Sequence, residues 1–267
     1  MRRLATALLV LGCVAGAAGW WYYWSGHFRP LVPAATVEKD VNWLDHIYSQ
    51  NPSVAEEAAR QLKHQGISAL PAIQEALRNQ TASEDTKKAA LKACAVLGPL
   101  AAPAISDVVA HLLIPGLTIE AAIALSFMGP DAFIPLRDAL ASEDPTVRKE
   151  SLRAIGKLRE RAPLDPPMVI PLLLDGLADP EPGVRVVAAT YLGIIHEEGE
   201  AAVPALIETL QDEDPEVRTA AATALGSFGS DAVVAVPALK KAVGDRDENV
   251  AREAGVALVK LNKQPVP

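Results

Sequence analysis

Through most of the chain, apolar residues recur at intervals of three and four, the spacing of one face of an α-helix. The clearest example is residues 212–226, DEDPEVRTAAATALG. Asp214 stands where a helix cap is expected, and Pro215 follows at the first helical position, where its missing N–H costs nothing. We expect Gly226 and Gly229 to end this helix. Its predicted buried face consists of Val217, Ala220, Ala221, Ala224 and Leu225.

A second apolar pattern precedes each such segment. At Pro204, the sequence PALIETL predicts a helix that buries Leu206, Ile207 and Leu210. The proline lies in or near the first turn, where several N–H groups lack helical partners anyway. Similar segments read PAIQEAL, PAISDVV, PLLLDGL and PALKKAV. Because small alanines let the two helices approach closely, each pair of segments is predicted to form a helical hairpin.

The two patterns repeat along the chain. The positions equivalent to Val217 are separated by 33, 32, 28, 37, 33 and 33 residues, and such a period is typical of stacked repeats. A single hairpin cannot cover both of its apolar faces, whereas stacked hairpins cover one another. We therefore predict an all-α fold, a right-handed α-solenoid of stacked helical hairpins over residues 51–262. The equivalent positions are Val54, Lys87, Ile119, Val147, Val184, Val217 and Val250.

The N-terminal region follows a different pattern. Residues 4–24 carry no charge and end in the aromatic cluster WWYYW. As a helix they would extend about 31 Å, close to the thickness of a bilayer's hydrocarbon core, with the aromatic residues at its interface. We predict a transmembrane signal-anchor over residues 1–24, a linker or stalk over 25–50, and a short tail over 263–267.

Two arginines before the apolar segment favour a cytoplasmic N-terminus. The predicted location is therefore the cytoplasmic membrane of a bacterium, crossed once, with the C-terminal domain outside the cytoplasm. Two alternatives remain open. Signal cleavage after residues 15–17, AGA, would release a secreted protein, and Cys13 after Gly12 would be the acylation site of a lipoprotein.

Composition and charge narrow the functional classes. Half of the residues are hydrophobic but only 4% are aromatic, which favours helices over sheets. The net charge is −8, and this opposes non-specific binding to nucleic acid, which depends on neutralising phosphates. The two cysteines, Cys13 and Cys94, lie in separate apolar segments and offer neither a disulfide framework nor a metal site.

The Asp-Pro-x-Val-Arg starts of residues 144–148 and 214–218 resemble those of HEAT repeats, in particular the short alanine-rich bacterial units of phycobilin lyases. Residues 179–185 match with a two-residue insertion, and the resemblance covers residues 51–262. It implies that arginine and aspartate side chains of adjacent units form a ladder. The implied members are Arg148, Arg185 and Arg218 with Asp179, with Asp212 or Asp214, and with Asp245 or Asp247.

Candidate chemistry is sparse. The five histidines include one His-Glu pair, His196-Glu197, whereas a di-metal centre needs four or more ligands. The serines lie in helical patterns without a GxSxG turn, and the glycines do not form a phosphate-binding run. We therefore expect no catalytic site, metal, cofactor or small-molecule substrate. A lyase-like accessory activity on a bound cofactor or client follows only from fold analogy.

The resemblance also implies that the Val-Arg helices line the concave side of the solenoid. Residues two, six and ten positions after each Val-type position then point outward, and they form a basic rim beside a neutral, partly apolar strip. We expect this surface to bind an acidic or amphipathic segment of a protein partner. The alternatives are an ordinary solvated face and a purely structural spacer. The candidates are Lys149, Arg153, Lys157, Val186, Thr190, Ile194, Thr219, Thr223, Arg252 and Val256.

Overall fold

A computed structural model describes residues 43–161, 164 and 166–262 of the 267-residue chain. The described residues form helices and turns, and none of them lies in a β-strand. The all-α prediction is therefore confirmed for this part of the chain. The predicted signal-anchor, most of the predicted linker and the predicted tail lie outside the described residues.

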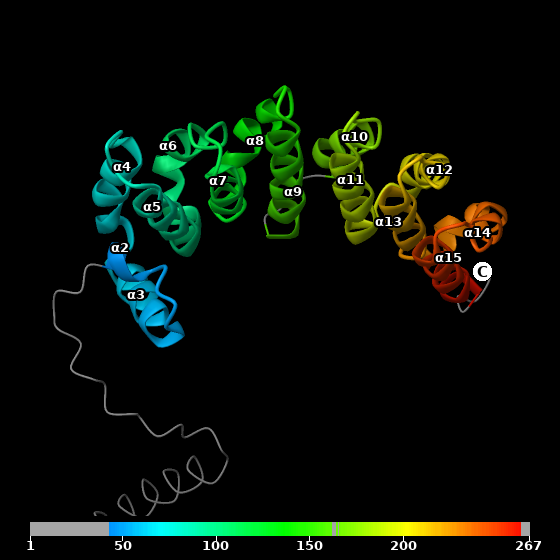
Figure 1. Cartoon of the computed structure of the whole chain (residues 1–267), viewed down its shortest axis with the longest axis horizontal. Helices are drawn as coiled ribbons and strands as arrows, with labels where there is room; N and C mark the ends of the chain where they lie inside the picture. The colour runs from blue at the N-terminus through cyan, green and yellow to red at the C-terminus, as the bar shows by residue number, and fades with distance from the viewer. Residues whose placement is uncertain (1–42, 162–163, 165, 263–267) are drawn as a thin grey trace, which may run out of the picture. The chain divides into compact units, whose positions relative to one another are not determined.

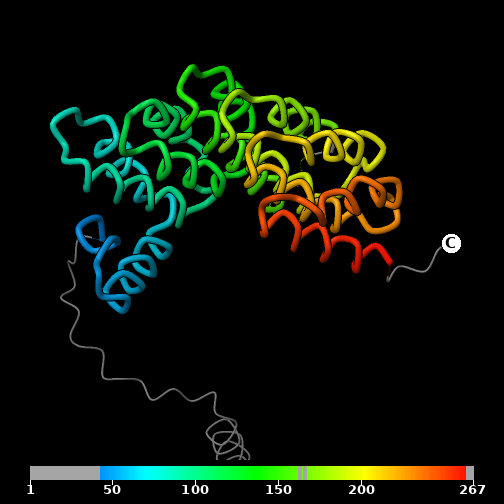
Figure 2. Tube along the Cα trace, turned by 45° about the vertical axis from the view of Figure 1, so that its right-hand side comes forward, coloured from blue at the N-terminus to red at the C-terminus, as the bar shows by residue number. Residues whose placement is uncertain are grey.

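The described helices form two sets that alternate along the chain and lie in two layers (Figures 1 and 2). We call the first set the inner helices, because they line the inner side of the curved row of helix pairs within residues 43–262 (Figure 1). The inner helices are α3 (Pro52–Gln65), α5 (Glu84–Leu97), α7 (Thr118–Leu125), α9 (Pro145–Arg161), α11 (Pro182–Ile195), α13 (Pro215–Leu225) and α15 (Glu248–Asn262). The outer helices are α4 (Leu70–Arg78), α6 (Ile105–Val109), α8 (Phe133–Ala139), α10 (Pro166–Gly176), α12 (Gly199–Thr209) and α14 (Val236–Ala242).

Local sequence explains where the inner helices begin and end. The carboxylate of Asp214 accepts hydrogen bonds from the backbone N–H groups of Glu216 and Val217, at 2.8 and 3.2 Å, and so caps α13. Gly229 follows α13 with φ +58°, a left-handed conformation that favours glycine, and begins the 3-10 helix η4 (Gly229–Ala235). Equivalent 3-10 turns lead into other outer helices: η1 (Gly66–Ala69), η2 (Gly98–Ala104) and η3 (Pro130–Ala132).

A single hydrophobic core extends through the described helix pairs, from Trp43 to Leu261. Each inner helix packs against the next inner helix, and the outer helices cover the side that the inner ones leave open. Leucine and alanine dominate this core, and the small alanines allow the helices to approach closely. Because the core continues from each helix pair into the next, no pair buries its apolar face alone. The stacking predicted from the repeat is therefore present in the structure.

The alignment of the early units needs correction. Ile119 was aligned with the buried Val217, but its side chain is 50% exposed, whereas Leu117 is 2% exposed. In α13, Val217 lies three residues after the capping residue Asp214. In α5, Ser83 caps the helix by accepting a hydrogen bond from Thr86 N, so the residue equivalent to Val217 is Thr86 and not Lys87. These units lack the Asp-Pro start, and spacing alone placed them wrongly.

The solenoid begins before residue 51. Helix α2 (Trp43–His46) packs on α3 and α5, and its Trp43 is buried together with Ile47. The Trp43 indole Nε1 donates a hydrogen bond of 2.9 Å to Gln65 Oε1 at the end of α3. Residues 43–47, which the sequence pattern assigned to the linker, therefore belong to the solenoid and pack on its first two inner helices.

One described segment, Glu84–Val109, is long and apolar enough to cross a membrane by length and composition. It is not one continuous helix, since Gly98, at φ +59°, separates α5 from the turn that leads to α6. Half of its most apolar window is buried within the protein. The segment therefore belongs to the core of the solenoid.

Gly226 directly follows the last residue of α13, as predicted, but it also has a packing role. Its backbone is right-handed, with φ −65°, and a Cβ built on it would lie 3.0 Å from Ala257 Cα on α15. Gly193 on α11 has the equivalent place, where a Cβ would lie 2.6 Å from Ala224 Cα on α13. These glycines allow successive inner helices to approach within backbone contact.

Candidate interaction surface

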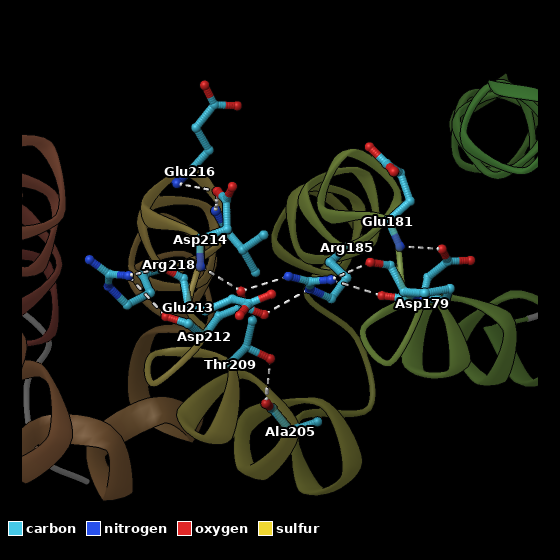
Figure 3. Close-up of polar contacts among 12 residues, drawn as sticks. Asp179, Glu181, Arg185, Ala205, Thr209, Asp212, Glu213, Asp214, Glu216 and Arg218 are labelled. Atoms are coloured by element: carbon cyan, nitrogen blue, oxygen red, sulfur yellow. Dashed lines mark hydrogen bonds and ion pairs between the residues drawn. The ribbon is translucent and has the colours of Figure 1, made fainter. Parts of the chain in front are cut away.

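Three arginines connect successive units in the C-terminal half of the solenoid. Each donates two hydrogen bonds, from Nε and one terminal nitrogen, to both oxygens of one aspartate, and all six donor–acceptor distances are 2.8 Å. Such bidentate pairs combine charge attraction with fixed geometry. Figure 3 shows the middle pair between α11 and the turn before α13. The pairs are Arg148 with Asp179, Arg185 with Asp212, and Arg218 with Asp245.

The remaining terminal nitrogen of each arginine fixes the start of its own unit. Arg185 Nη1 donates to the backbone carbonyl oxygens of Asp179 and Pro180, at 2.9 and 3.1 Å. Arg148 and Arg218 make the equivalent bonds to the turns before their own helices. Each arginine thus ties its own turn to the turn of the next unit.

The structure decides between the aspartates that the sequence left open. Asp212 and Asp245 pair with the arginines, whereas Asp214 and Asp247 accept hydrogen bonds from backbone N–H groups and cap α13 and α15. Asp179 occupies the place of Asp212, because its Oδ1 likewise accepts from the backbone N–H two residues later. The two-residue insertion inferred at residues 179–185 is therefore absent.

The ladder formed by these three pairs ends where the next unit lacks the arginine or the aspartate that a further pair would need. Ser142 occupies the aspartate position before α9, where its Oγ accepts from Asp144 N at 3.2 Å. Thr118 and Ala251 occupy the arginine positions of α7 and α15, so neither can supply a cation there. The three pairs therefore connect α9, α11, α13 and the turn before α15.

The pairs shift the pKa values of the aspartates. Hydrogen bonds from Arg148 hold the pKa of Asp179 below its usual value, and those from Arg218 do the same for Asp245. For Asp212, burial by itself raises the pKa, but the hydrogen bonds from Arg185 and from Asp214 N and the nearby positive charges outweigh it. All three carboxylates are thereby favoured in the charged form in the folded state.

A lowered pKa in the folded state predicts a loss of stability in acid. The contribution of these aspartates is complete above the unfolded-state pKa of about 3.9 and is lost as the pH falls through the lower folded-state values. We expect the free energy of unfolding, measured in urea, to fall as the pH drops below about 4. The Asp212→Asn variant should show a smaller fall, and an identical fall would contradict this assignment.

The predicted interaction residues all lie on inner helices. Thr190 and Ile194 on α11, Thr223 on α13, and Val256 on α15 are exposed, and the others on these helices range from half-buried to exposed. The hydroxyls of the threonines donate to backbone carbonyls one turn earlier, for example Thr190 Oγ1 to Val186 O at 2.7 Å. This strip is thus neutral, with apolar and methyl groups toward solvent.

The basic rim on α9 is only partly neutralised. Lys149 Nζ and Arg153 Nε lie 3.7 and 3.4 Å from the carboxylate of the buried Glu150. Among the described residues, no carboxylate lies within ion-pair distance of Lys157. Arg161, at the end of α9, places its guanidinium 4.0 Å from the centre of the Phe127 ring.

The sequence missed an apolar part of this surface on α7 and the turn that follows it. Ile119, Ile123 and Phe127 follow one another at intervals of four and are 50%, 40% and 38% exposed. The wrong alignment of α7 had placed the outward positions two residues later, on side chains that are buried. The interval of four was visible in the sequence, but which face it marked depended on the packing.

Reactive side chains in the described residues are isolated from one another. No group of three or more His, Cys, Asp or Glu side chains among these residues is arranged to hold a metal ion. Burial raises the pKa of the Cys94 thiol to about 12, so the thiol stays protonated at neutral pH. His196 is exposed and has a left-handed backbone at the end of α11, with Nδ1 2.9 Å from Ile194 O.

The two-layered stack and its inner surface define a helical-repeat solenoid. Residues 170–260 match the family model of HEAT repeats, so the resemblance to HEAT repeats is confirmed for these residues. This stretch includes the second and third arginine–aspartate pairs. The finer similarity to phycobilin-lyase units stays a prediction.

Solved structures share the fold at low sequence identity. Kap121p matches with a TM-score of 0.58 and 15% identity, over 79% of this chain and 26% of its own. Kap95p, in a structure with RanGDP, matches with a TM-score of 0.57 and 17% identity, over 84% of this chain and 35% of its own. YibA of E. coli matches with a TM-score of 0.51 and 17% identity, over 85% of this chain and 93% of its own. The chain thus spans about a quarter to a third of the two Kap proteins, and a search of curated proteins found no match.

Proposed function

We propose that this protein is a scaffold that binds a protein partner through the exposed side of its inner helices. The observation that carries the proposal is the continuity of this surface, where successive inner helices carry half-buried or exposed neutral, apolar and basic residues at equivalent positions. A basic surface on a chain of net charge −8 suits an acidic partner. Structures of Kap121p with Nup53p and of Kap95p with RanGDP show related solenoids in complexes with proteins.

The proposal is tested by cross-linking in intact cells. A photo-reactive amino acid at Thr190 or Thr223 should capture the same partner, because both side chains lie on the exposed side of neighbouring inner helices. The matched control is Glu208, which is exposed on the outer helix α12. Mass spectrometry then identifies the captured protein. Equal capture from Glu208, or none from the two inner positions, would contradict the proposal.

Charge reversal on α9 should weaken this capture. The double variant Arg153→Glu, Lys157→Glu replaces two positive charges with two negative ones on the inner helix α9, where both side chains are half-buried. We expect at least a tenfold loss of partner recovered by affinity purification. The control is Lys240→Glu, Lys241→Glu on the outer helix α14, where both lysines are exposed and recovery should be unchanged.

We further propose that residues 1–24 anchor the scaffold in the cytoplasmic membrane, with the solenoid outside the cytoplasm and without catalytic activity of its own. The uncharged stretch 4–24 and the arginines before it support this proposal. An anchored protein resists extraction by alkaline carbonate and is digested by protease added to spheroplasts. Release of the shortened chain into the medium would favour signal cleavage instead.

A further inference from the structure

The stripe of Ile119, Ile123 and Phe127 exposes large apolar side chains along one side of α7 and the turn after it. A shallow depression beside this stripe is lined by Ile123 and Ser126 on one side and by Arg153 and Lys157 of α9 on the other. Exposed apolar residues that are contiguous and bordered by polar groups are typical of sites for a protein ligand. We call this stripe the α7 stripe.

Basic side chains border the α7 stripe on both sides. Helix α7 packs between α5 and α9, and the exposed sides of those helices carry Lys88 and Lys92, and Arg153 and Lys157. Lys88 pairs with Glu84 at 2.6 Å and is also near the carboxylate of Glu120 on α7. Arg153 lies near Glu150, which also lines the depression. No carboxylate among the described residues is within ion-pair distance of Lys92 or Lys157. Each border therefore keeps positive charge that its own acids do not neutralise.

Two cation–aromatic contacts hold the ends of this surface in place. The guanidinium of Arg161 lies 4.0 Å from the centre of the Phe127 ring, and Lys92 Nζ lies 4.6 Å from the centre of the Tyr48 ring. Aromatic and arginine side chains that are already positioned lose less entropy when a ligand covers them. Phe127 with Arg161 is therefore the expected anchor of a binding site.

Apolar residues flanked on both sides by positive charge are complementary to an amphipathic segment with the opposite arrangement. We propose that the surface of α5, α7 and α9 binds a peptide segment of a partner protein whose apolar residues are flanked by Asp or Glu. This proposal rests on the proposed scaffold function and specifies the chemistry of its ligand. Because the stripe belongs to α7, one of the helices on the inner side of the curved row of helix pairs (Figure 1), a short peptide reaches it more easily than a flat lipid surface does.

The test is a selection from a random 12-residue peptide library displayed on phage, with the purified solenoid as bait. The proposal expects enriched peptides with net negative charge and with two or more large apolar residues. Their affinity, measured by fluorescence anisotropy, should fall at least tenfold for Phe127→Ser and for Lys157→Glu. It should also fall with rising salt, since charge contributes to the binding. No enrichment, or enrichment of neutral or basic peptides, would overturn the proposal.

Matched controls separate binding from folding. Val234→Ser removes an apolar side chain in η4 that is more exposed than those of the α7 stripe, and its affinity and unfolding midpoint should equal those of the wild type. Ile123→Ser is a second variant on the α7 stripe, and it keeps the test valid if Phe127→Ser proves unstable. If both stripe variants fold and bind peptide normally, this proposal fails. Cross-linking from Thr190 and Thr223 tests the scaffold function independently, and its success would leave that function standing.

Discussion

Gly193→Ala is expected to destabilise the solenoid by about 3 kcal/mol, although alanine normally favours a helix. The added Cβ would lie 2.6 Å from Ala224 Cα and 2.8 Å from Ala224 Cβ. The first of these atoms is backbone, so no side-chain rotation relieves the contact, and α11 and α13 must separate. Because repeats depend on their neighbours, the loss should affect the C-terminal units together. Urea unfolding followed by circular dichroism measures it.

Gly255 supplies the control for this prediction. It lies within the inner helix α15, and a Cβ added there meets no atom within 4 Å. Gly255→Ala should therefore stabilise the protein by about 0.5–1 kcal/mol, since it only restricts the unfolded chain and favours the helix. Opposite signs for the two substitutions are the expected result. A Gly193→Ala protein as stable as the wild type would show that the inner helices are not in backbone contact.

Arg185→Ala is expected to cost about 3 kcal/mol of unfolding free energy. The Arg185 side chain is 9% exposed and is surrounded by acceptors, namely the two oxygens of Asp212 and the carbonyls of Asp179 and Pro180. Its removal leaves these groups without their donor in a partly buried turn, and this is the larger part of the cost. The same unfolding measurement applies, and the effect should centre on the α11–α13 boundary.

Arg252→Ala is the matched control, because that side chain is 61% exposed and contacts only nearby groups of its own helix. Its expected effect is within about 0.5 kcal/mol. In the double variant Arg185→Ala, Asp212→Ala, the cost should be less than the sum of the single costs, since the second substitution removes an already unpaired carboxylate. Additive costs would mean that the two side chains do not stabilise each other.

The start of a helix could be predicted from the sequence in units where a capping residue and a proline mark it. Where Asp or Asn and proline precede the helix, as at Pro215 and Pro145, the start of the helix was correctly placed, because capping and the fixed φ of proline act within a few residues. At α7 these signals are missing, and spacing alone put Ile119 in the core. The apolar α7 stripe was missed for the same reason.

The arginine–aspartate ladder could also be predicted only in part. The three arginines were identified, but the sequence offers two aspartates near each of two of them, Asp212 or Asp214 and Asp245 or Asp247. Only the path of the turn decides which carboxylate reaches the neighbouring arginine and which one caps its own helix. Sequence spacing does not contain that path.

The sequence by itself determined the helical class, the repeat of about thirty residues and the alternation of two kinds of helix along the chain, because capping, proline position and apolar period are local properties. The tertiary structure decided which face of α7 is exposed, which aspartates pair with arginine, and that Trp43 is part of the core of the solenoid. It also assigned Gly193 and Gly226 to the contacts between helices. These features depend on atoms that are distant in sequence, and such atoms become neighbours only when the units stack.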